Sequence, residues 1–218
     1  MTLDLDPERR LALAYVPAPH RAAIETLWRL DVTLGSVLVT GREPLVSQIR
    51  LAWWREALEK LDRERPPAEP MLEAVATNLL PAGVSGAELA AMEEGWGVLL
   101  SPEPLGSEEL DLYARLRGEK LFFYSARLLG AESEASPAAG QMWALVDLAR
   151  RSADPDEARA ALRAARERPA TARWPHDLRP LGMLAALARR DAERALPLEP
   201  QGSPARMLRM LRHRLTGR

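Results

Sequence analysis

Residues 43–58 read EPLVSQIRLAWWREAL, and this segment carries more information about the fold than any other part of the sequence. One apolar stripe at helical spacing is formed by Leu51, Trp54, Leu58 and Leu61. A second stripe is formed by Leu45, Ile49 and Trp53. Because a helix that is apolar on two faces tends to bury both of them, we expect this helix to lie inside a helical bundle with its first half buried on two sides.

The rest of the sequence shows the same helical periodicity, interrupted by proline and glycine. No segment has the sustained alternation of apolar and polar residues that is typical of a half-buried strand. We expect helices over residues 7–16, 19–39, 44–61, 71–80, 85–100, 107–129, 137–151, 154–167, 178–194 and 203–215. The short connections favour antiparallel neighbours, so the pattern predicts an all-α, single-domain bundle.

The composition fits one helical domain and gives no reason to expect nucleic acid as a partner. The chain has 218 residues, 47% of them hydrophobic, and 30 Lys and Arg side chains balance 31 Asp and Glu side chains. This near-zero charge offers no general attraction to a polyanion. Cysteine is absent, which excludes thiolate nucleophiles and thiolate metal sites.

The sequence also argues against several other classes of protein. Residues 1–10 contain acids and no apolar segment, unlike a signal peptide, and no apolar run approaches the roughly twenty residues that span a bilayer. We therefore expect a cytoplasmic protein that is at most peripheral to the inner membrane. The histidines are far apart, and the sequence has no nucleophile elbow, Walker loop or dinucleotide fingerprint.

Three segments in order resemble the squalene/phytoene synthase family. Leu27-Trp28-Arg29-Leu30-Asp31 precedes the Trp53-Trp54-Arg55 run, and Tyr113-Ala114-Arg115-Leu116-Arg117 leads to Leu128-Leu129-Gly130. The resemblance extends along roughly the whole chain. It is strongest to the divergent branch that includes the mitochondrial complex I assembly factor related to phytoene synthase. It implies an isoprenoid-synthase bundle with a central cavity, formed by residues 1–218 as one domain.

The acidic motifs of that family are incomplete in this sequence. Members that make squalene or phytoene carry two D-x-x-x-D-type motifs, because several carboxylates must hold Mg²⁺ before a diphosphate can leave. Here Asp31 is followed at i+4 by Gly35, and Asp147 is followed at i+4 by Arg151. We therefore expect no dedicated metal site, with Mg²⁺ as cofactor only if Asp31 and Asp147 remain as residual catalytic ligands.

The resemblance places a set of charged and aromatic residues around the central cavity: Arg29, Asp31, Arg50, Trp53, Trp54, Arg55, Tyr113, Arg117 and Asp147. Arginines in such a cavity could bind a diphosphate without metal. The alternative is structural: the tryptophans pack in the core, and the arginines pair with acids or helix carbonyls. Asp31 lies in an apolar helix, so we expect it to accept a hydrogen bond from Arg50 or a tyrosine.

Two further segments allow both a functional and a structural interpretation. Gly118-Glu119-Lys120 follows Arg117 where family enzymes have small residues, so it could bend the helix or narrow an apolar tunnel; alternatively it is an exposed charged turn. The C-terminal segment 203–218 is basic and has an apolar face formed by Met207, Leu208, Leu211 and Leu215. Such a helix can bind an anionic membrane surface, or it can pack on the bundle with its arginines in water.

Three functions remain open on the sequence. The first is a non-catalytic protein that binds an isoprenoid or lipid or assists assembly of respiratory complex I. The second is a Mg²⁺-dependent transferase that condenses two prenyl diphosphates, with Asp31 and Asp147 as metal ligands. The third is a peripheral membrane module that acts through its basic C-terminal helix.

Overall fold

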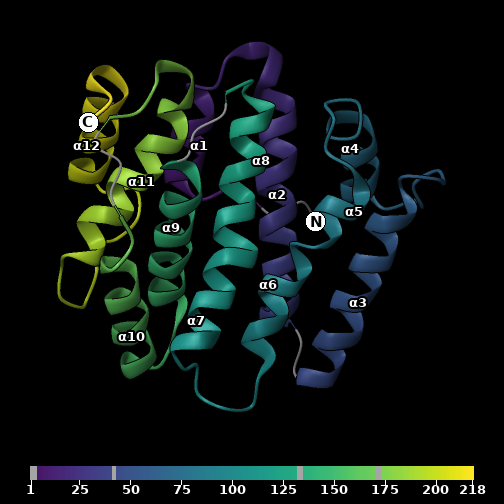
Figure 1. Cartoon of the computed structure of the whole chain (residues 1–218), viewed down its shortest axis with the longest axis horizontal. Coiled ribbons are helices and arrows are strands. Elements are labelled where there is room, and N and C mark those ends of the chain that lie inside the picture. The colour runs from purple at the N-terminus through teal and green to yellow at the C-terminus, as the bar shows by residue number, and fades with distance from the viewer. Residues whose placement is uncertain (1–3, 41–42, 132–134, 170–172) are drawn as a thin grey trace.

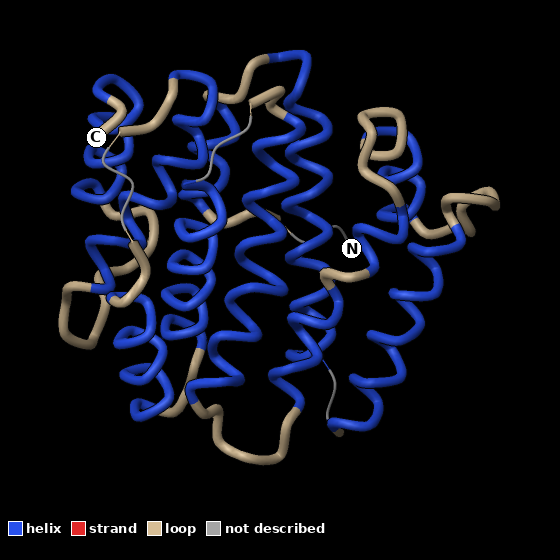
Figure 2. The backbone as a smooth tube through the Cα atoms, viewed as in Figure 1, coloured by secondary structure: helices blue, strands red, loops and turns tan. Residues whose placement is uncertain are grey.

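The helices lie side by side from α3 (Pro44–Lys60) at one edge of the molecule to α12 (Pro204–Thr216) at the other (Figure 1). The computed structural model describes residues 4–40, 43–131, 135–169 and 173–218. Every regular element in these ranges is a helix, and none is a strand (Figure 2). The all-α fold class expected from the sequence is confirmed.

Between these edges the chain forms short and long helices in sequence. The first half contains α1 (Pro7–Ala14), α2 (Ala18–Thr40), α4 (Pro70–Asn78), α5 (Gly86–Ala90), α6 (Glu93–Gly97) and the 3-10 helix η1 (Val98–Leu100). The second half contains α7 (Ser107–Tyr113), the π-helical segment η2 (Ala114–Glu119), α8 (Lys120–Leu128), α9 (Ala135–Arg151), α10 (Pro155–Arg166), the 3-10 helix η3 (His176–Leu178) and α11 (Arg179–Ala192).

Several helices begin at a side chain that caps their free backbone N–H groups. Asp6 accepts hydrogen bonds from the backbone of Glu8 and Arg9, and Pro7 occupies the first turn of α1. Ser85 and Glu88 form a capping box at α5. These local signals explain why most helix starts could be predicted within a few residues.

The segment expected as one helix over residues 85–100 is divided into α5, α6 and η1. Both halves contact α3, but their closest backbone approaches are to different neighbours. A Cβ atom on Gly86 would lie 2.1 Å from the carbonyl oxygen of Leu58 in α3, and one on Gly95 would lie 2.8 Å from the backbone nitrogen of Arg117 in η2. One straight helix could not make both close approaches, so the chain turns between them.

Buried apolar side chains from α1 to α12 form one connected core cluster. α9 packs against η2, α8, α10 and α11, and α2 packs against α3, α4, α6 and α8. The continuous helix made by α7, η2 and α8 therefore lies between α2 and α9. This arrangement brings the chemically distinctive residues of the three segments toward one another.

α3 differs from the expectation that its first half is buried on two sides. The stripe that contains Leu51 and Trp54 is buried, but Leu45, Ile49 and Trp53 are exposed. The expectation was wrong because α3 is an edge helix that packs on α2, α5, α6 and η1 through one face only. Among the described helices, none is both long enough and apolar enough to cross a membrane.

Candidate functional site

The central feature of the bundle is the side chain of Arg117, which has no exposed surface. Its Nε lies 2.8 Å from Oδ1 of Asp31, and its Nη2 lies 3.0 Å from Oδ2 of the same carboxylate. Nη2 also lies 2.8 Å from Oδ2 of Asp147, and Nη1 donates to the hydroxyl of Tyr113. One guanidinium group thus connects α2, α7 and α9, with the two-pronged geometry that favours an arginine over a lysine.

Two more arginines complete the charge balance. Nη1 of Arg9 lies 3.0 Å from Oδ2 of Asp31, while its Nε lies 3.1 Å from Oδ2 of Asp6. Nε of Arg151 lies 3.1 Å from Oδ2 of Asp147. Sequence analysis found the cation at position 151 but missed Arg9, because α1 is remote in sequence and carries no local sign of its partner. We refer to Arg9, Asp31, Arg117, Asp147 and Arg151 as the central ion cluster.

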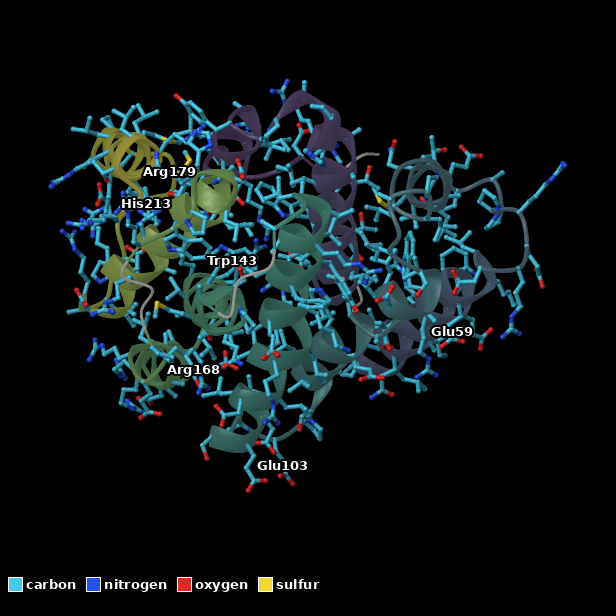
Figure 3. All side chains as sticks on the ribbon, turned by 45° about the horizontal axis from the view of Figure 1, so that its top comes forward. Glu59, Glu103, Trp143, Arg168, Arg179 and His213 are labelled. Carbon is cyan, nitrogen blue, oxygen red and sulfur yellow. The ribbon has the colours of Figure 1, made fainter. Side chains whose placement is uncertain are left out.

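Aromatic rings enclose the central ion cluster. The guanidinium carbon of Arg117 lies 4.0 Å from the ring centroid of Trp96 and 4.9 Å from that of Trp143. The guanidinium carbon of Arg9 lies 4.7 Å from the ring centroid of Trp143. These distances are typical of cation–π contacts. Figure 3 shows Trp143 in the interior of the bundle, with Glu59 at one edge and His213 near the other.

Gly35 leaves room for the ring of Trp96 beside α2. A Cβ atom on this residue would lie 2.5 Å from the ring of Trp96. Any side chain at position 35, including an aspartate at i+4 from Asp31, would therefore displace the ring that covers Arg117. Gly35, Trp96 and the buried Arg117 therefore form one packed unit.

The electrostatics of the central ion cluster hold both aspartates in their charged form. Burial alone would raise the pKa of Asp31, but the Arg117 and Arg9 guanidinium groups outweigh it and hold the pKa below its ordinary value. The pKa of Asp147 is lowered in the same way by Arg117, Arg151 and Arg9 against the effect of burial. Burial raises the pKa of Tyr113 to about 12, so this residue stays a neutral phenol at physiological pH.

The structure brings together only part of the residue set expected around a cavity. Asp31, Tyr113, Arg117 and Asp147 meet at the central ion cluster, and Trp54 is buried in the core. The others lie elsewhere: Arg29 pairs with Glu25, Arg50 donates to Thr40, and Arg55 and Trp53 are exposed. The structural alternative is correct for Trp54 but not for Trp53.

Two local expectations are wrong. Asp31 was expected to accept from Arg50 or a tyrosine, but its partners are Arg117 and Arg9, because Arg50 lies on the outer side of α3. Glu119 and Lys120 do not form an exposed charged turn. Glu119 accepts a hydrogen bond of 2.6 Å from Gln141, and Lys120 donates one of 2.8 Å to the carbonyl oxygen of Ala91.

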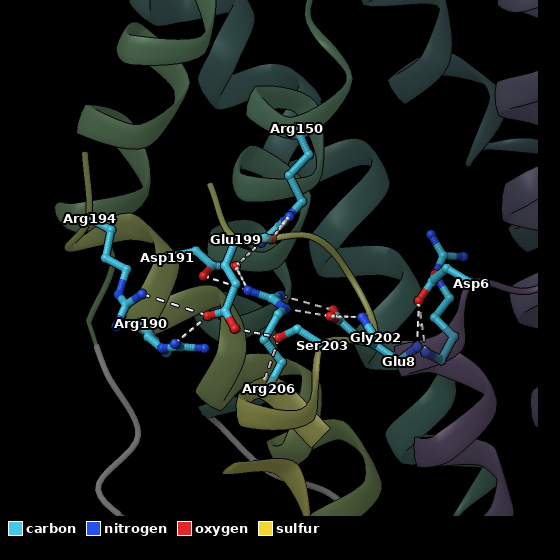
Figure 4. A network of polar contacts seen from close by, with 11 residues as sticks. Asp6, Glu8, Arg150, Arg190, Asp191, Arg194, Glu199, Gly202, Ser203 and Arg206 are labelled. Carbon is cyan, nitrogen blue, oxygen red and sulfur yellow. Dashed lines mark hydrogen bonds and ion pairs between the residues drawn. The ribbon is translucent and has the colours of Figure 1, made fainter. Parts of the chain in front are cut away.

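A second buried ion network fixes α12 to the bundle (Figure 4). Arg206 lies 2.7 and 2.8 Å from the two carboxylate oxygens of Asp191, and its Nη2 lies 3.0 Å from Oε2 of Glu8. Arg150 binds the same Asp191 at 2.6 Å. Arg206 belongs to the basic C-terminal segment 203–218, whose arginines were expected at a membrane surface or in water, but it is buried because α12 packs against α11 and α1. Leu208 and Leu215 stay exposed, so membrane binding by α12 remains a prediction.

The central ion cluster is suited to holding helices together and not to binding a large ligand. Asp31 and Arg117 have no exposed surface, and the cavity that reaches Asp147 has a volume of about 20 Å³. The space where the resemblance implies a cavity is filled by Arg117, Trp96 and Trp143. Within the described ranges, no group of three or more His, Cys, Asp or Glu side chains is placed to hold a metal ion.

Comparison with known proteins found no matching family model, no matching curated protein and no matching solved structure.

Proposed function

We propose that this chain is a non-catalytic protein of the squalene/phytoene synthase type that acts by binding a partner, with assembly of respiratory complex I as the specific role. One observation carries the proposal: Arg117 joins Asp31 to Asp147 where a working synthase would need those carboxylates free for metal. The positive charge of the guanidinium occupies the position that a divalent cation would need. A buried cation and a Mg²⁺ ion could not share the two carboxylates without strong repulsion.

The same observation counts against the Mg²⁺-dependent transferase. To bind metal, Asp31 and Asp147 would have to leave Arg117, which would then be buried without a counter-charge. Breaking a buried ion pair in this way costs about 3–5 kcal/mol. A prenyl chain would further require the rings of Trp96 and Trp143 to move out of the centre. We therefore assign partner and lipid binding to the surface of the bundle.

The first test measures catalysis directly. Purified protein incubated with Mg²⁺ and labelled farnesyl or geranylgeranyl diphosphate is expected to release no diphosphate above the protein-free blank. Turnover within the ordinary enzymatic range of about 1–1,000 per second would contradict the proposal. If turnover were seen, three variants would show whether the two aspartates cause it. Loss of turnover in both Asp31→Asn and Asp147→Asn would assign it to them. The control Glu25→Gln changes an acid of α2 outside the central ion cluster and would then retain turnover.

The surface that fits partner binding is the outward stripe of α3, formed by Leu45, Ile49 and Trp53. These side chains are 64%, 63% and 47% exposed, although all three are large and apolar. They recur every four residues and extend over about 12 Å of helix. An apolar helix face of this kind is a common docking element for a helix of another protein, and tryptophan is the residue type most enriched among binding hot spots.

The second test locates the partner. A photo-reactive amino acid in place of Trp53 is expected to cross-link to a complex I subunit or assembly intermediate in the native membrane fraction. The same amino acid at Arg163, an exposed position of α10, serves as the control. Trp53→Ser is expected to reduce assembled complex I without unfolding the protein. Cross-links from position 53 that match the control, or that join only two copies of this chain, would count against the assembly role.

A further inference from the structure

Two adjoining cavities lie between α12, α11 and α9, away from the central ion cluster. The inner cavity has a volume of about 300 Å³, and the outer one has a volume of about 600 Å³. Both are lined by Ala186, Arg209 and Arg218, so they form one continuous depression. The inner part is apolar, with Ala139, Met142, Trp174 and Ala185 on its walls. We call this pair of cavities the α11–α12 pocket.

The α11–α12 pocket carries uncompensated positive charge. Arg189, which pairs with Glu193, lines it together with four further arginines, Arg173, Arg209, Arg212 and Arg218, and no acidic residue stands among its described lining residues. None of these four arginines forms an ion pair with a carboxylate anywhere in the described chain, unlike the buried Arg117 and Arg206. Arg209 makes one long hydrogen bond of 3.4 Å to the carbonyl oxygen of Ala186. A concave surface with charge of one sign attracts and concentrates small ions of the other.

His213 forms part of the wall of the inner cavity. Its side chain lines the inner cavity and is 97% buried, since only 3% of its surface is exposed. Both ring nitrogens are inaccessible to solvent and lack a hydrogen bond of good geometry within the described residues, although the backbone of Arg218 lies close enough to interact with the ring. Burial lowers the pKa of His213 to about 4, and the nearby backbone of Arg218 opposes this only in part. The ring is therefore neutral at pH 7, with one nitrogen as donor and the other as acceptor.

The backbone of α11 is shaped to accept this histidine. A Cβ atom on Gly182 would lie 2.3 Å from Nε2 of His213 and 2.7 Å from the ring of Trp174. Glycine at position 182 thus lets both rings lie directly on the helix. The imidazole ring therefore forms a fixed part of the wall between α11 and α12.

We propose that the α11–α12 pocket binds a small organic anion: a phosphate or carboxylate that carries a compact apolar group. The anionic end contacts Arg209, Arg212 and Arg218, and the apolar group packs on Met142 and Trp174. The inner volume of 300 Å³ corresponds to about ten water-sized groups, which is the size of an aromatic ring with its substituents. This site is separate from the α3 stripe and does not depend on the assembly role.

The test measures binding of phenyl phosphate by titration calorimetry at low salt. Inorganic phosphate, which lacks the apolar ring, is the control. Phenyl phosphate is expected to bind at least ten-fold more tightly than inorganic phosphate. The double variant Arg209→Gln, Arg212→Gln is expected to weaken binding at least ten-fold. The matched control is Arg63→Gln, an exposed arginine near the end of α3, which is expected to leave the affinity unchanged.

A steric variant tests the place of binding without altering charge. Ala186→Leu, at the wall common to both cavities, is expected to abolish binding of phenyl phosphate while the protein stays folded. Vesicles of phosphatidic acid identify the source of the ligand: displacement of phenyl phosphate by the vesicles indicates a lipid headgroup, and no displacement indicates a soluble anion. Unchanged affinity in the arginine double variant, equal affinity for the two phosphates, or no binding of either would overturn the proposal.

Discussion

Replacing Arg117 with methionine is expected to lower the free energy of unfolding by about 3–5 kcal/mol, enough to threaten the fold of a domain of this size. Methionine fills much of the same volume but leaves Asp31 and Asp147 without their main counter-charge. Both carboxylates are buried, so water cannot take over the lost interaction. Urea denaturation at pH 7, followed by circular dichroism, measures the change.

The controls for this prediction come from the same central ion cluster. Arg151 also pairs with Asp147, but 52% of its side chain is exposed, so Arg151→Gln is expected to cost less than about 1 kcal/mol. Combining Arg117→Met with Asp31→Asn and Asp147→Asn removes the buried negative charges and is expected to regain part of the lost stability. Equal losses for Arg117→Met and Arg151→Gln would contradict a central role for Arg117.

The pH dependence follows from the direction of the two pKa shifts. The pKa values of Asp31 and Asp147 lie below 3.8 in the folded protein, so the unfolded chain binds these protons at higher pH. Their contribution to stability is therefore complete above about pH 5 and is lost as the pH falls through and below 4. In Arg117→Met the two carboxylates are buried without the Arg117 guanidinium. The difference in free energy of unfolding between this variant and the parent protein is therefore expected to shrink as the pH falls.

Much of the central ion cluster could be predicted from the sequence, and the missing parts share a physical cause. Asp31, Tyr113, Arg117 and Asp147 stand out locally, because each interrupts an apolar helical stripe or belongs to a distinctive motif. Arg9 does not, since its partner Asp31 lies in another helix and the contact depends on how α1 packs. Trp96 was missed for the same reason. Its only trace in the sequence is Gly35, at i+4 from Asp31, where the absence of a side chain leaves room for the Trp96 ring.

The α3 stripe shows the limit of periodicity as a guide. Leu45, Ile49 and Trp53 have the spacing of a buried face, but spacing reports only that side chains share a side of a helix. Whether that side meets another helix depends on the position of α3 in the bundle, which is at its edge. The same exposure that made the packing expectation wrong is what supports a docking function. The pattern indicates a face that can be buried, and a partner outside this chain is one way to bury it.

Replacing Gly118 with alanine is expected to lower the free energy of unfolding by about 1–3 kcal/mol, although alanine is the better helix former. A Cβ atom at this position would lie 2.2 Å from the carbonyl oxygen of Gly140 and 2.7 Å from Cβ of Ala144. Neither obstacle is the end of a flexible side chain, so the clash can be relieved only by moving η2 away from α9. Such a movement separates Arg117 from Asp147 at the same time, because they lie on these two elements.

Gly97→Ala is the matched control, since the nearest atom to a Cβ at that position is 3.8 Å away, at the end of the Glu93 side chain. It is expected to leave stability unchanged or to raise it slightly through helix propensity. If Gly118→Ala behaved like Gly97→Ala in urea denaturation, the backbones of η2 and α9 could not be in direct contact. Loss of stability in Gly118→Ala but not in Gly97→Ala would link the π-helical segment to the central ion cluster. The close contact between η2 and α9 that requires glycine at position 118 also fixes the distance between Arg117 and Asp147.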